Sequence, residues 1–163
     1  MFQADSYCRH NQTFHMPSAS KEEENFTRLI LLLTKPCRGL MKRILSESCR
    51  NYQYWTIQNL LNRKRKSILD TYRGYNYRKK YFPRAGETNV DEWDIVMLYH
   101  MITFVRVPSL TEPLKSILNM RNALAHPGKV LVSRRKYINY YRQIQIFIRE
   151  GLTYLKRCGL LIT

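Results

Sequence analysis

Apolar residues that recur at every third or fourth position are the feature that most restricts how this chain can fold. The clearest run comprises Ile138, Tyr141, Ile144, Ile148, Leu152 and Leu155. This spacing places apolar side chains on one face of an α-helix. No segment alternates apolar and polar residues over a convincing length, and no internal repeat is present. The sequence therefore predicts an all-α fold with four to six helices packed as a bundle.

Local signals mark the helices of the first half of the chain. The segment from Ser20 to Glu23 has the pattern of a capping box, in which the serine and the glutamate satisfy free amides at a helix start. The helix that follows should reach about Ser48, but Pro36 and Gly39 should bend or split it. Apolar spacing predicts the next helix over Tyr54–Leu69.

Turn and capping residues divide the second half. Residues 83–89 read as a loop, and Asp91 is the expected cap of a helix that extends to about Phe104. Thr111 is the expected cap of the next helix. Ser133 introduces the last helix, and Gly159 ends it.

Two ring side chains fall in the apolar series between Asp91 and Phe104. Trp93 is the expected core anchor. His100 belongs to the same series, where a histidine is more often packed than catalytic, although a direct role is the alternative.

The chain length fits one domain, which we place at residues 20–158, between a polar N-terminal tail (1–19) and a short C-terminal tail (159–163). The four cysteines are far apart, as expected for reduced thiols in the cytoplasm or nucleus: Cys8, Cys37, Cys49 and Cys158. The N-terminal tail also holds His10 and His15, but a fourth metal ligand and a known spacing are missing. We therefore expect no metal and no cofactor.

The charge balance indicates a polyanionic partner. Lys and Arg number 28 against 12 Asp and Glu, which gives a net charge of +16 on a chain that is 44% hydrophobic. Such an excess on a folded body favours nucleic acid first and an anionic membrane surface second. The longest apolar run, Leu29–Leu33, is five residues long, so no transmembrane segment is expected.

Positive charge is concentrated in three clusters. They are Arg63, Lys64, Arg65 and Lys66; Arg78, Lys79 and Lys80; and Arg134, Arg135 and Lys136. Aromatic residues lie among the cations between positions 63 and 84, and tyrosine rings can stack on the bases of single-stranded RNA while cations bind phosphates. The alternative is a solvated helix face whose tyrosines pack on the core. The first two clusters also have the spacing of a bipartite nuclear import signal.

Residues 117–128 carry the most informative polar group. Ile117 and Leu124 belong to an apolar stripe, so Arg121, Asn122 and His126 are polar residues on a core-forming helix. Pro127 and Gly128 should end this helix at or near His126. Asn122 and His126 are four residues apart and would share a face, and the long Arg121 side chain could reach the same place. An imidazole is well suited to general acid–base catalysis.

The Arg-Asn-x-x-x-His pattern resembles the Arg-x4-6-His signature of HEPN domains (higher eukaryotes and prokaryotes nucleotide-binding). The resemblance covers residues 20–158 and is closest to the animal subtype found in the DAZ-interacting RING-type ubiquitin ligase. The matching segments are Phe26–Leu33, Tyr81–Pro83, Glu92–Ile95, Leu98-Tyr99 and Met120–His126. Such domains sit in larger animal proteins, so this chain is either a stand-alone version or part of a longer product with further domains or partner proteins.

The resemblance implies an antiparallel helical bundle that forms a homodimer, with the Arg and His of both subunits lining one cleft. Active members cut single-stranded RNA without metal. On that basis His126 would assist attack of the RNA 2′-hydroxyl on the adjacent phosphate, Arg121 would hold the phosphate, and Asn122 would orient them. The products would be a 2′,3′-cyclic phosphate and a 5′-hydroxyl.

Two functions therefore remain open: a metal-independent endoribonuclease, and a HEPN module that binds RNA or dimerises without cleaving. A third use of the charge is binding of DNA or an anionic membrane. Peptide hydrolysis and glycine-loop phosphate binding have no support, because no residues with the required spacing are present.

Overall fold

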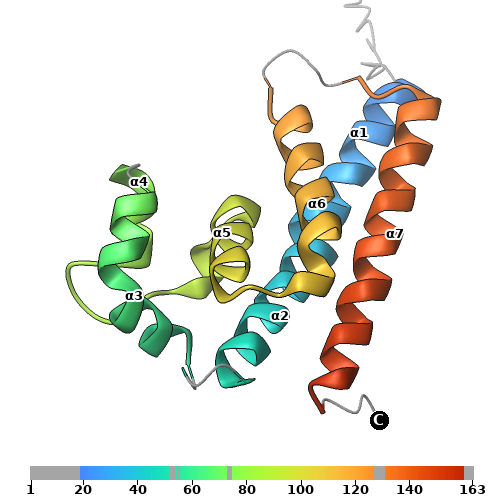
Figure 1. Ribbon diagram of the computed structural model, residues 1–163. Coiled ribbons are helices and arrows are strands. Elements are labelled where there is room, and N and C mark those ends of the chain that lie inside the picture. The colour runs from blue at the N-terminus through green and yellow to red at the C-terminus, as the bar shows by residue number, and fades with distance from the viewer. Residues whose placement is uncertain (1–18, 52–53, 55, 73–74, 127–130, 160–163) are drawn as a thin grey trace, which may run out of the picture.

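The computed structural model describes residues 19–51, 54, 56–72, 75–126 and 131–159, and within these ranges every regular element is helical (Figure 1). The α-helices are α1 (Lys21–Leu32), α2 (Arg38–Asn51), α3 (Ile57–Thr71), α4 (Tyr75–Tyr81), α5 (Ile95–Val105), α6 (Thr111–Leu124) and α7 (Arg134–Arg157). Because α1 and α2 continue one another through a π-helical turn, these ranges contain six helical rods. The predicted all-α bundle is confirmed.

The first long helix is bent where Pro36 was expected to bend it. Ser20 and Glu23 form the predicted capping box, with the Ser20 amide donating to the Glu23 carboxylate over 2.7 Å. A π-helical turn at Leu33–Cys37 contains Pro36. Proline has no amide hydrogen to donate within the helix. The Arg38 amide donates five residues back, to the Leu33 carbonyl, so the chain passes the proline with one wide turn and remains helical.

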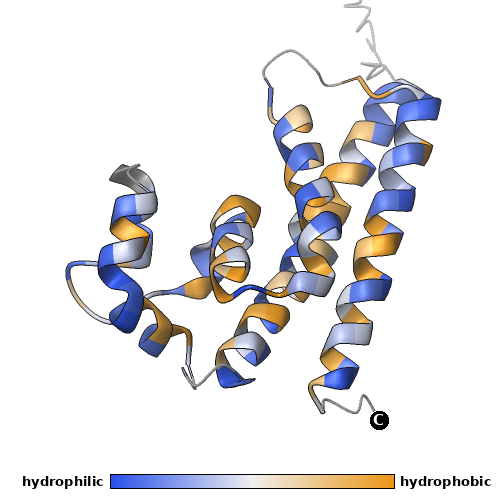
Figure 2. Ribbon diagram, in the orientation of Figure 1, coloured by the Kyte–Doolittle hydropathy of each residue, from blue (hydrophilic) through white to orange (hydrophobic). Residues whose placement is uncertain are grey.

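Helix α5 lies at the centre of the molecule, between α3 and α4 on one side and α2 and α6 on the other (Figure 1). Most of its side chains are buried: Ile95, Val96, Met97, Leu98, Met101, Ile102 and Val105. Figure 2 shows it as the most uniformly apolar helix ribbon. A helix that is apolar on all sides has to be enclosed by other elements.

Aromatic side chains join α3 and α4 to α5. The Tyr81 hydroxyl donates to the Met97 carbonyl over 3.0 Å, and the Tyr81 ring meets Trp93 edge-on at 4.9 Å between centroids. The Tyr72 ring stacks on His100 at 4.3 Å. Trp93 is fully buried, as predicted for a core anchor. Of the two interpretations of the tyrosines between positions 63 and 84, packing on the core is therefore the correct one for Tyr72 and Tyr81.

Two predicted caps were wrong. Asp91 lies inside a 3-10 turn, Val90–Glu92, and α5 is capped instead by Asp94, whose carboxylate accepts from the Met97 amide over 2.9 Å. Thr111 is the first residue of α6 and caps nothing, because a 3-10 turn at Pro108–Leu110 leads directly into the helix. In both places a short 3-10 turn precedes the helix, so the helix start does not fall directly after the predicted cap.

The other predicted helix boundaries lie closer to those of the structure. Helix α3 begins at Ile57, with Thr56 as its cap, and not at Tyr54. The loop at 83–89 is confirmed. Ser133 caps α7 as predicted, and Gly159 follows its end with a φ of 87°. The N-terminal tail lies almost entirely outside the described residues, as do Cys8, His10 and His15.

Helix α7 packs closely on α2 at Gly151. A Cβ atom placed on Gly151 would lie 2.8 Å from the Leu40 side chain and 3.1 Å from that of Ile44, whereas one on Gly39, which is also helical, would meet nothing within 4 Å. Alanine in place of helical glycine stabilises by roughly 0.5–1 kcal/mol where there is room, while overpacking a core costs about 1–3 kcal/mol.

We therefore predict that Gly39→Ala raises the free energy of unfolding by up to about 1 kcal/mol and that Gly151→Ala lowers it by a similar amount. Urea unfolding followed by circular dichroism measures both. Equal stabilisation by the two substitutions would show that α7 and α2 are not in close contact at Gly151.

Candidate functional site

The motif residues lie at the carboxyl end of α6. Arg121 and Asn122 are in its last turn, the helix ends at Leu124, and Ala125 forms the cap with its amide donating to the Arg121 carbonyl over 3.0 Å. His126 follows the helix and is exposed. The helix thus ends near His126 as predicted. Ala125 is the C-cap, with a φ of −82° and a ψ of −7°, so His126 lies just beyond the helix, and a shared face of Asn122 and His126 stays a prediction.

The Arg121 guanidinium is already engaged by protein groups. One of its nitrogens lies 3.7 Å from the Asp94 carboxylate, and another donates to the Asn122 side-chain oxygen over 3.2 Å. Both members of the ion pair are partly exposed, at 37% for Arg121 and 42% for Asp94. Among the described residues, no hydrogen bond or ion pair joins His126 to Arg121 or Asn122. Within one chain the three side chains are neighbours at a helix end but do not form a connected site.

Beside Arg121 there is a small pocket of about 280 Å³. Its lining comes from three places in the chain: the bend of the α1–α2 helix, the segment before α5, and the end of α6. The Arg38 side chain closes one edge, since its Nε donates to the Trp93 carbonyl over 2.8 Å and a terminal nitrogen to the Asp91 carbonyl. The lining thus combines apolar side chains with two guanidinium groups, those of Arg38 and Arg121, and two carboxylates, those of Glu92 and Asp94.

Sequence reasoning missed the residues that surround Arg121. Asp94 is the most important, because one carboxylate caps α5 and also pairs with Arg121. A signal was present: Asp94 directly precedes the continuous apolar run of α5 and is a better-placed cap than Asp91. Nothing in the sequence indicates that Arg38 contacts the segment before α5.

The first two basic clusters lie on α3 and α4, on the far side of α5 from the motif (Figure 1). The Arg65 guanidinium lies over the Phe82 ring, 4.6 Å from its centroid, and Arg78 donates to the Leu69 carbonyl over 3.2 Å. The seven cations of these clusters are exposed apart from Lys64, which is partly buried. Arg65 and Arg78 thus link α3 with α4 and the residue that follows it, while their exposed side chains can still reach anions in solvent.

The third cluster, Arg134, Arg135 and Lys136, forms the exposed first turn of α7. Helices α6 and α7 run antiparallel, so this turn lies at the same end of the bundle as the end of α6 (Figure 1). Of the three clusters, the third is therefore the one the fold brings to the end that carries the motif.

His100 serves the packing of α5. Its ring stacks on Tyr72, and burial lowers its pKa, an effect that the charge of Asp94 partly opposes. Its Nδ1 atom is buried without a hydrogen-bond partner among the described residues. A neutral imidazole is favoured in this position.

Burial keeps two free cysteines in the unreactive, protonated thiol form. Cys37 and Cys49 are free, and burial raises the pKa of each to about 12. Within the described ranges no group of three or more His, Cys, Asp or Glu residues is arranged to hold a metal ion. None of the helices in those ranges combines the length and apolar character needed to cross a bilayer.

Comparisons with protein-family models, curated proteins and solved structures gave no match.

The double role of Asp94 leads to a prediction about stability. Asn caps helices about as well as Asp, so Asp94→Asn should keep the α5 cap and lose only the partly exposed ion pair, at a cost of about 0.5 kcal/mol or less. Asp94→Ala should lose both and cost roughly 1–2 kcal/mol. Urea unfolding of the two variants separates these contributions. Equal losses would mean that the cap contributes nothing.

Proposed function

We propose that this protein is an RNA-binding HEPN-type domain that cuts single-stranded RNA without a metal ion at Arg121, Asn122 and His126. One observation carries this proposal: the motif residues and the exposed cations of the first turn of α7 lie at the same end of the bundle. RNA phosphates attracted by those cations would come close to the imidazole. A cytoplasmic or nuclear location, where thiols stay reduced, suits the free Cys37, Cys49 and Cys158.

The proposed reaction needs only the RNA itself and these side chains. His126 takes the proton of a ribose 2′-hydroxyl, the 2′-oxygen attacks the neighbouring phosphorus, and the bond from phosphorus to the 5′-oxygen breaks. The proton that His126 took then passes to the departing 5′-oxygen, which gives a 2′,3′-cyclic phosphate and a 5′-hydroxyl. Arg121 would stabilise the growing negative charge on the phosphate. For this step the Arg121 guanidinium would leave the Asp94 carboxylate and bind the RNA phosphate.

A homodimer would complete the site. In one chain His126 is not joined to Arg121 or Asn122, so a second copy placed across α6 could bring the imidazole of one subunit toward the guanidinium of the other.

A second candidate function is a HEPN module that binds RNA or dimerises without cleaving it. The ion pair between Arg121 and Asp94 favours this alternative, because a guanidinium held by a carboxylate is less available to a phosphate. The basic surfaces would then serve affinity alone.

We predict that His126→Ala lowers the rate of RNA cleavage by about a hundredfold or more, since general acid–base groups typically contribute 10² to 10⁴. RNA affinity should barely change, because phosphate contacts dominate it. Arg121→Ala should slow cleavage and also weaken binding. Cleavage of labelled single-stranded RNA in the presence of a chelator is the measurement, and circular dichroism checks that each variant is folded.

Cleavage by folded His126→Ala at the wild-type rate would assign the activity to another group or to a contaminant. A wild-type protein that binds RNA and never cuts it would favour the second candidate function.

We also predict a dimer at micromolar concentration, to be measured by sedimentation velocity. A monomer at every concentration tested, in a preparation that cleaves RNA, would show that one chain suffices for the site.

A further inference from the structure

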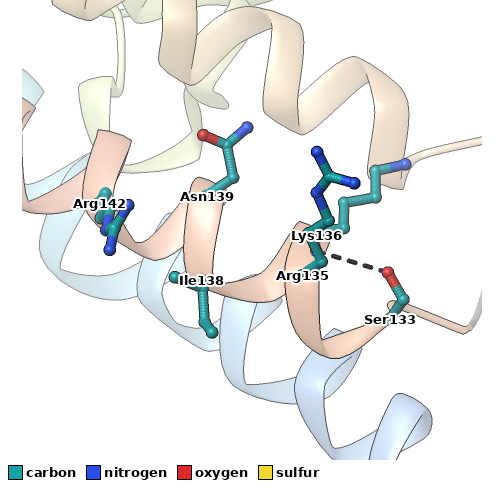
Figure 3. Close-up of a pocket in the computed structure, with 6 residues that line it drawn as sticks. All are labelled: Ser133, Arg135, Lys136, Ile138, Asn139 and Arg142. Atoms are coloured by element: carbon teal, nitrogen blue, oxygen red, sulfur yellow. Dashed lines mark hydrogen bonds between the residues drawn. The ribbon is translucent and has the colours of Figure 1, made fainter.

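We propose that the start of α7, from its cap Ser133 to Arg142, forms the groove that holds the phosphates of single-stranded RNA. The groove is lined by Ser133, Arg135, Lys136, Ile138, Asn139 and Arg142 and has a volume of about 590 Å³ (Figure 3). This inference rests on the proposed RNA-binding function. It assigns phosphate contacts to Asn139 and Arg142 and selects α7 over α3 and α4 as the surface that guides the strand.

Helical geometry aligns the polar groups of the groove. Arg135, Asn139 and Arg142 stand at positions i, i+4 and i+7, which share one face of a helix. With a rise of 1.5 Å per residue, they extend over roughly 10 Å along α7. All three are exposed, and Figure 3 shows Asn139 between Arg142 and Arg135 along the helix. Two guanidinium groups with an amide between them can therefore contact successive phosphates of one strand.

The cations of the groove have no carboxylate partner. Five cations elsewhere in the described ranges form ion pairs: Arg28 with Glu24, Lys42 with Asp91, Arg50 with Glu47, Arg121 with Asp94, and Arg149 with Glu150. None of the described carboxylates pairs with Arg135, Lys136 or Arg142. Lys136 instead lies over the Tyr140 ring, 5.4 Å from its centroid.

The described acids nearest the groove are those of the first turn of α1, and two of these three have partners of their own. The first turn of α1, with Glu22, Glu23 and Glu24, is close in the fold, since the Val132 amide donates to the Glu22 carbonyl over 3.2 Å. Even so, Glu23 is bonded to the Ser20 amide and Glu24 pairs with Arg28. The single acid of α7, Glu150, is paired with Arg149. Positive charge that the protein leaves unpaired on a concave surface is available to an anion.

The groove lies where it can bind the same RNA strand that the motif residues would cut. Helices α6 and α7 are antiparallel neighbours, so a strand bound along α7 from Arg142 toward Arg135 continues toward the end of the bundle where α6 terminates (Figure 1). The cations of α3 and α4 lie beyond α5, and the rings of Tyr72 and Tyr81 pack inward there. Single-stranded RNA, which can follow a narrow basic track through its backbone, fits this path.

The test compares two double variants of the same helix with the same change in charge. Arg135→Gln with Arg142→Gln removes two cations of the groove, and Lys156→Gln with Arg157→Gln removes two at the other end of α7. The probe is a labelled oligouridylate, with affinity measured over a range of salt concentrations. Each phosphate contact to a single strand contributes about 0.7 to the salt slope, so the groove variant should lose about 1.4 and the control variant much less.

A second measurement uses the wild-type protein and needs no substitution. Bound RNA should protect Lys136 from acetylation and leave Lys156 as reactive as in the free protein. Mass spectrometry of both lysines gives the two values in one sample. Anionic phospholipid vesicles serve as the comparison, and protection of Lys136 by vesicles but not by RNA would overturn the proposal.

The outcomes separate this inference from the proposed function. If wild-type protein binds RNA while both double variants lose the same affinity and salt slope, the groove proposal is wrong and RNA binding stands. If wild-type protein does not bind RNA at all, both are wrong. The Asn139→Ala variant, which keeps the net charge, should weaken binding if the amide contacts a phosphate.

Discussion

The enclosure of α5 is the interaction on which the rest of the structure depends. Its buried side chains face α2 and α6 on one side, and the rings of Tyr72 and Tyr81 cover the other. Burial of apolar area stabilises a fold by roughly 25 cal/mol per Å². A helix that is apolar on every side therefore contributes more stability when several helices surround it than when it packs against only one. Tyr72, at the end of α3, and Tyr81, at the end of α4, attach these two helices to α5.

The candidate site depends on the same helix. Asp94 caps α5 and pairs with Arg121, and Arg38 of α2 donates to the carbonyl of Trp93. The guanidinium of the motif is therefore positioned by the start of α5 and not by α6 alone. Any anion that binds Arg121 has to compete with the Asp94 carboxylate, which is held in place by its hydrogen bond from the Met97 amide.

Charge is distributed unevenly around this framework. Among the described residues, Glu24, Glu47, Asp91 and Asp94 each pair with a cation, whereas no described carboxylate pairs with Arg135, Lys136 or Arg142 of α7. Exposed ion pairs contribute little to stability, about 0–1 kcal/mol each. Cations of α7 that pair with no described carboxylate therefore forgo little stability. They lie at the end of the bundle that carries the motif, where they are well placed to contact a polyanion.

The sequence by itself determined the helices, because 3.6-residue spacing, the Ser20 capping box, the Ser133 cap and Pro36 act over a few neighbouring residues. It also determined that Arg121, Asn122 and His126 gather near one helix end. Only the tertiary structure decided that Asp94 and not Asp91 caps α5, that Arg121 pairs with Asp94, and that Tyr72 and Tyr81 face the core. Each of these depends on which helices meet, and contacts between residues far apart in the chain leave no periodic signal in the sequence.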